Sequence, residues 1–158
     1  MSNVVGLESL LKKLNSLGGN VEETVYKSMQ RQGQLVKDDA QDSVSVDTGD
    51  LKKSIYRETK KIKGKITVRV YTNSDHAAYV EFGTGKKGET TSVEDKYPGP
   101  LSYKQDKWLV DIPDVGYRWI EGQPAQPYLY PALKNNEDRI IKNIRQDIEE
   151  AIRKVAKR

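Results

Sequence analysis

The fold class follows from residues 55–71, IYRETKKIKGKITVRVY, in whose second half apolar and polar side chains alternate. Alternation with a period of two is typical of a β-strand that has one covered face. The turn residues Lys63-Gly64-Lys65 predict a hairpin that joins strands 55–62 and 66–71. This pattern predicts an antiparallel sheet whose covered face takes the apolar side chains Ile66, Val68 and Val70.

Helical patterns flank the hairpin on both sides. Upstream, a capping-box variant at Asn20 and Glu23 opens a helix that runs to about Asp42, with the buried stripe Val21, Val25, Met29, Gln32, Val36 and Ala40. Downstream, a long helix begins between Tyr128 and Tyr130, with an apolar face that includes Leu129, Leu133, Ile140, Ile144, Ile148 and Ala151. We therefore expect an α+β fold, in which a small antiparallel β-sheet is packed by N-terminal helices and a long C-terminal helix.

The chain is expected to form one domain over residues 1–158, with two additions. Apolar residues at helical spacing predict a helix over residues 1–17, which can serve as an arm. Residues 84–126 are expected to be an insertion: a long loop from Gly83 to Gln105, then two strands around a turn near Pro113-Asp114. Periodicity alone leaves residues 76–82 open between a helical turn and a strand.

Composition narrows the class of protein. The chain has no cysteine, so disulfides and thiolate metal sites are excluded. Its 35% apolar and 32% charged residues fit either a small domain with mobile loops or a subunit whose arms become ordered on partners. No apolar run approaches the ~18 residues of a membrane span, and the first residues lack the pattern of a signal peptide. We expect no membrane partner.

Catalytic chemistry is not expected from this sequence. His76 is the single histidine, and no Gly-x-Ser-x-Gly turn accompanies it. The glycine-rich stretch 83–90 lacks the lysine and hydroxyl residue that follow the last glycine of a phosphate loop. The acids of residues 38–50 fit a solvated helix face better than a magnesium site. We therefore expect no enzyme, no catalytic residue, no cofactor and no metal.

Two basic groups leave a second class of function open. One surrounds the hairpin turn and the other ends the last helix; they are Lys60, Lys61, Lys63, Lys65 and Arg153, Lys154, Lys157, Arg158. Lysines there can contact phosphates, or can solubilise the chain and block strand addition. The alternatives to a structural protein are therefore a basic DNA-binding module, or a small metal-dependent nuclease that would use Asp47 or Glu81.

Three segments carry a resemblance to a known family. They are VDTGDLKKSI at 46–55, YVEFGT at 79–84 and QPYLYPAL at 126–133. In this order they resemble the HK97-gp10-like family of phage neck and tail proteins, and the resemblance spans roughly residues 20 to 155. Tyr128 stands where phenylalanine is usual, and residues 84–126 are longer than in simpler members.

The resemblance implies a structural virion protein of a tailed phage or prophage, at the head–tail junction, as a neck, connector or tail-completion subunit. It implies a homo-oligomer, a ring, that contacts other neck and tail proteins, is assembled in the host cytoplasm and lies transiently near DNA. The family segments supply the candidate interface residues Asp47, Thr48, Gly49, Leu51, Tyr79, Glu81, Phe82, Gly83, Thr84, Gln126, Pro127 and Pro131.

Whether those segments are folding devices or partner contacts stays open at this point. Glycines suit tight turns, and Pro127 and Pro131 suit the start of a helix. Glu81 stands out, because a carboxylate between Val80 and Phe82 needs a partner, either inside the subunit or across an interface.

Overall fold

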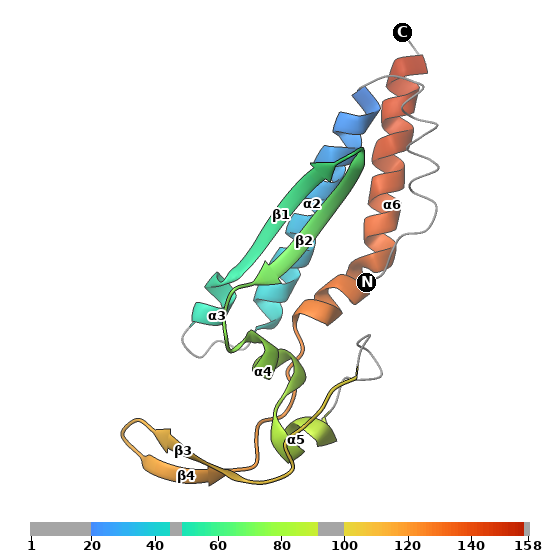
Figure 1. The fold of residues 1–158 in the computed structure, drawn as a ribbon. Helices are drawn as coiled ribbons and strands as arrows, with labels where there is room; N and C mark the ends of the chain where they lie inside the picture. Colours follow the sequence, from blue (N-terminus) through green and yellow to red (C-terminus); the bar gives the residue numbers. More distant parts are fainter. Residues whose placement is uncertain (1–19, 45–48, 92–99, 157–158) are drawn as a thin grey trace.

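A computed structural model describes residues 20–44, 49–91 and 100–156. The α2 helix, Asn20–Ser43, lies beneath a hairpin of β1, Ile55–Ile62, and β2, Lys65–Thr72, and runs beside the long α6 helix, Leu129–Ala156 (Figure 1). The short α3 helix, Asp50–Lys53, joins α2 to β1. The predicted α+β class is confirmed. The helix expected over residues 1–17 lies outside the described residues.

The α2 helix buries the predicted stripe. Val21, Val25 and Ala40 are almost fully buried, and Gln32 is buried with them. Gly33 faces the sheet, where a Cβ atom would collide with Val68 and lie 3.0 Å from Arg57 Cδ. Glycine therefore allows α2 to lie directly on the hairpin.

The β1–β2 hairpin pairs antiparallel, with Ile55 opposite Thr72 and Ile62 opposite Lys65. Because side chains alternate across a strand, Ile55 and Ile66 face the helices and are buried. The opposite face carries Tyr56 and Ile62, which are exposed. This one-sided sheet is the predicted arrangement.

The core consists of two apolar clusters between α2, α6 and the hairpin. One is formed by Val21, Val25, Ile66, Ile144, Ile148 and Ala151, and the other by Val36, Ala40, Val44, Ile55, Tyr128 and Ala132. Ile140 packs against both clusters. One expectation is wrong: Leu133, placed on the buried face of α6, is 47% exposed. At the start of α6 the buried face instead passes through Ala132 and Asn136, which are four residues apart.

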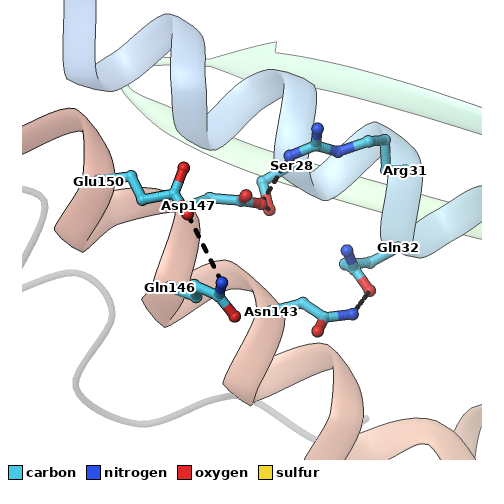
Figure 2. A network of polar contacts seen from close by, with 7 residues as sticks. All are labelled: Ser28, Arg31, Gln32, Asn143, Gln146, Asp147 and Glu150. Carbon is cyan, nitrogen blue, oxygen red and sulfur yellow. Dashed lines mark hydrogen bonds and ion pairs between the residues drawn. The ribbon is translucent and has the colours of Figure 1, made fainter.

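Polar side chains join α2 to α6 along the seam between the clusters. Asn143 donates to Gln32 Oε1 at 3.0 Å, and Ser28 and Arg31 both donate to Asp147 Oδ2, at 2.5 and 2.7 Å (Figure 2). Further along, Asn136 donates to Asp39 Oδ2 at 2.6 Å. Asp39 was expected to be solvated, and the structure instead places it in this seam. These pairs fix one antiparallel register for the two helices.

The remaining elements lie at the end of the molecule where α6 begins. They are α4, Ala77–Phe82, α5, Gly85–Thr90, and a second hairpin of β3, Trp108–Ile112, and β4, Gly116–Ile120 (Figure 1). The segment left open between helix and strand is thus helical. The loop expected from Gly83 to Gln105 is wrong in its first part, which forms α5. Both strands of the second hairpin were predicted.

No helix in the described ranges has the length and apolar character of a membrane span.

Candidate functional site: a buried glutamate that caps the C-terminal helix

Glu81 connects two of the family segments. It lies near the end of α4, is only 4% exposed, and points at the start of α6. Its Oε2 atom accepts hydrogen bonds from the backbone N–H groups of Tyr128 and Leu129, at 2.8 and 2.9 Å. Its Oε1 atom accepts from the N–H of Tyr130, at 2.9 Å. The carboxylate that needed a partner therefore has it inside the subunit.

Glu81 and Pro131 together account for every free amide at this helix end. A helix leaves about four N–H groups without partners inside the helix. Glu81 accepts from three of them, and Pro131, in the next position, has no N–H to satisfy. The N–H of Ala132 then makes the first helical bond, to Tyr128 O at 3.4 Å. A carboxylate here is further stabilised by the positive end of the helix dipole.

Backbone pairing holds the glutamate in place. The N–H of Gln126 donates to Val80 O at 2.8 Å, and the Gln123 side chain donates to Tyr79 O at 2.8 Å. Thr84 and Gln123 form an isolated antiparallel bridge, with N···O distances of 2.9 and 3.1 Å. Residues 79–84 and 123–126, distant in sequence, thus run side by side where Glu81 projects.

Gly83 makes this close approach possible. Its φ of 72° and ψ of −180° are reached readily only by glycine. A Cβ atom here would lie 2.7 Å from both Ala125 N and Gly88 Cα. The predicted tight backbone at Gly83 is therefore present, with Gly88 of α5 packed directly against it.

The other candidate residues of this segment have separate positions. Tyr79 is 54% exposed, whereas Phe82 is half-buried and its carbonyl accepts a 3.0 Å hydrogen bond from the Tyr103 hydroxyl. Pro127 is half-buried and the Gln126 side chain is exposed. Tyr79 and Gln126 therefore remain the side chains of this group that are open to a partner.

The first family segment lies beside the second core cluster. Asp47 and Thr48 are outside the described residues, so their role as interface residues stays a prediction. Gly49 has a φ of 77° and precedes α3. Leu51 packs against the cluster that contains Tyr128. The first family segment and the Glu81 cap therefore both adjoin the core cluster that contains Tyr128.

Tyr128 is the most buried large side chain of the site. It is fully buried, and within the described ranges its hydroxyl has no hydrogen-bond partner. Burial, together with the nearby negative charge of Glu81, raises the pKa of Tyr128 to about 12. The hydroxyl belongs to a side chain that packs within the second apolar core cluster.

The β3–β4 hairpin is a feature that the sequence did not single out as a surface. Five of the nine exposed large apolar residues in the described ranges belong to it: Leu109, Ile112, Val115, Tyr117 and Trp119. β3 and β4 pack extensively only on each other. The two tryptophans were a usable signal, because a short hairpin rarely buries such residues by itself.

The nuclease alternative is not supported by this geometry. In the ranges that the structure describes, no three His, Asp or Glu residues lie close enough together to hold a metal ion. Both oxygens of Glu81 are engaged by backbone amides. A metal at Glu81 would therefore have to displace the cap of α6.

The contacts described around Glu81 are capping and packing contacts. Residues 8–83 match the family model of the HK97-gp10-like proteins, described as "Bacteriophage HK97-gp10, putative tail-component". The resemblance seen in the sequence is confirmed over this range, 76 of the 158 residues. No curated protein and no solved structure matches the chain.

The match concerns a family whose description names a phage tail component. It ends at Gly83, so it includes Glu81 but not the helix start that Glu81 caps.

Proposed function

We propose that the chain is a structural subunit of the head–tail junction of a tailed phage or prophage, and that its copies assemble into a ring. The observation that carries this proposal is the match of residues 8–83 to a family of phage tail components. The ring is the more specific part of the proposal. When each subunit repeats the same head-to-tail contact, the assembly closes into a ring if the rotation between neighbours permits it.

The structure supports a non-enzymatic role in one respect. The family residues that it describes serve mainly to hold α6 on α4, through the Glu81 cap and the Thr84–Gln123 bridge. The β3–β4 hairpin carries exposed apolar side chains and packs extensively on no other described element. Exposed apolar surfaces of this kind suit assembly.

The decisive experiment measures the mass of the purified full chain by light scattering over a concentration series, followed by negative-stain imaging. A ring-forming subunit gives one defined oligomer mass and ring-shaped particles. A monomer at every concentration contradicts self-assembly into a ring.

The virion assignment has its own test. Particles purified from a host that carries the phage or prophage should contain peptides of this chain, detected by mass spectrometry. Their absence from particles with joined heads and tails would contradict the junction role, whatever the mass of the purified chain.

A further inference from the structure

Exposed apolar side chains gather on one face of the β3–β4 hairpin. Leu109 pairs with Trp119 and Asp111 with Tyr117, so these four side chains share one face, which we call the apolar hairpin face. Leu109, Tyr117 and Trp119 are 49%, 66% and 68% exposed. The other face is better covered, because Trp108 lies against Gly85 and under the Lys104 ammonium.

The free charge on the apolar hairpin face and its turn is negative. Asp111 and Asp114 are exposed and have no ion pair with any described residue. At the hairpin base Lys107 and Glu121 pair at 2.8 Å, and this contact lowers the pKa of the Glu121 carboxyl. Arg118 pairs with Val110 and so lies on the other face.

The β1–β2 hairpin carries a surface of opposite charge. Its solvent face, which we call the basic sheet face, contains the exposed side chains Tyr56, Lys60, Ile62, Lys65, Thr67 and Arg69. Glu58 is the single acid there and pairs with Lys60 at 3.0 Å. Lys65, and Lys63 at the turn, have no ion pair with a described residue.

Both surfaces combine exposed apolar side chains with unpaired charge. Ile62 is 62% exposed on the sheet that carries the unpaired lysines, and Tyr117 is 66% exposed on the hairpin that carries the unpaired aspartates. The turn of β1–β2 and the β3–β4 hairpin lie at opposite ends of the fold (Figure 1). The two surfaces of one chain are thus placed to contact two neighbours and not each other.

We propose that the apolar hairpin face of one copy docks on the basic sheet face of the next copy. The contact places Leu109, Tyr117 and Trp119 against Ile62 and the turn end of the basic sheet face, and Asp111 and Asp114 near Lys63 and Lys65. Aromatic anchors with a charged rim are the usual composition of a protein interface. Two different surfaces make the contact heterologous, as a ring requires. The inference rests on the proposed self-assembly and names its contact.

A charge exchange tests the contact in the full chain. The hairpin variant is D111K/D114N, and the sheet variant is K65E/K63N. Asparagine is chosen at 114 and 63 because their φ angles, 65° and 50°, are positive and asparagine tolerates this region. All four positions are exposed, so both variants should keep the wild-type circular dichroism and melting temperature.

Each variant alone should associate about tenfold or more weakly than the wild type in sedimentation experiments, because like charges then meet at the contact. An equimolar mixture should recover association, since the cationic hairpin of one variant fits the anionic sheet of the other. Recovery only in the mixture would exclude a merely general effect of charge.

The apolar part of the proposed contact is tested by a matched pair of variants. Trp119→Ser should weaken association about tenfold or more, as loss of an aromatic anchor does. Leu133→Gln removes a similarly exposed apolar side chain from α6 and should leave association unchanged. A wild-type chain that is monomeric at all concentrations overturns this contact together with the ring. An oligomer that is insensitive to the variants, or a mixture that fails to recover, overturns the contact alone.

Discussion

At the scale of single residues, Glu81 has the largest expected effect on stability. Glu81→Gln keeps the size of the side chain but turns one acceptor oxygen into an N–H donor that faces backbone N–H groups. We expect the free energy of unfolding to fall by about 2–3 kcal/mol, since buried amides lose a charged acceptor. Urea denaturation measures this. Glu149→Gln, on the exposed side of α6, is the control; equal stability of both variants would contradict the capping role.

Tyr128 gives a prediction of the opposite sign. Its buried hydroxyl has no partner in the described part of the chain, so Tyr128→Phe removes a desolvated polar group and leaves the ring in place. We expect the free energy of unfolding at neutral pH to rise by about 1 kcal/mol. Thermal denaturation of the two proteins measures the difference. A lower melting temperature in the variant would show that the hydroxyl has a partner.

The same residue predicts a pH dependence. The pKa of Tyr128 is about 12 in the folded chain, raised by burial and by Glu81, and about 10 in an unfolded chain. Between these values the unfolded state has lost the proton and the folded state keeps it, so stability falls as pH rises. The wild type should lose roughly 2 kcal/mol relative to Tyr128→Phe between pH 10 and 12. Parallel curves for the two proteins would contradict this.

At the scale of elements, the polar seam between α2 and α6 makes a separable prediction. Gln32→Leu leaves the Asn143 amide without its acceptor and should cost about 1 kcal/mol. The double change Q32L/N143L should recover most of that loss, because neither helix then buries an unpaired amide. A double-mutant cycle in urea measures the coupling. Additive effects would show that the pair contributes nothing to the register.

The elements also show how much the sequence could predict. The α2 stripe, both hairpins and the start of α6 follow from local periodicity and turn residues, and the structure has them. The partner of Glu81 does not follow in that way, because the amide of Leu129 is 48 residues distant in the chain. An acidic residue within an apolar segment indicates that it needs a partner, but only the tertiary structure identifies that partner.

The exposed residues show the other limit. Leu133 fits the apolar spacing of α6, yet it is exposed because the helix turns its neighbours Ala132 and Asn136 toward the core. Trp119 and Tyr117 alternate along β4 as a covered face would, and the structure leaves them uncovered. Alternation of apolar and polar side chains along a strand predicts that the apolar face packs against another element. Whether the cover comes from the same chain or from a neighbour depends on the tertiary structure.

At the scale of the whole molecule, the β3–β4 hairpin should be dispensable for folding. Neither core cluster contains a residue of β3 or β4, and the paired side chains of Lys107 and Glu121 keep its two ends together. Replacing residues 109–119 by Gly-Gly retains the half-buried Trp108 and Ile120 and removes the exposed apolar side chains.

We expect this shortened chain to unfold cooperatively in urea, with a free energy within about 1 kcal/mol of the wild type. Its association should be lost, because the deletion takes away the apolar hairpin face. If the fold is lost as well, the hairpin is part of the core and its exposure has no bearing on partners. If the fold and association both persist, the neighbours meet through another surface. If the shortened chain folds but no longer associates, then Trp119 is exposed because it serves assembly.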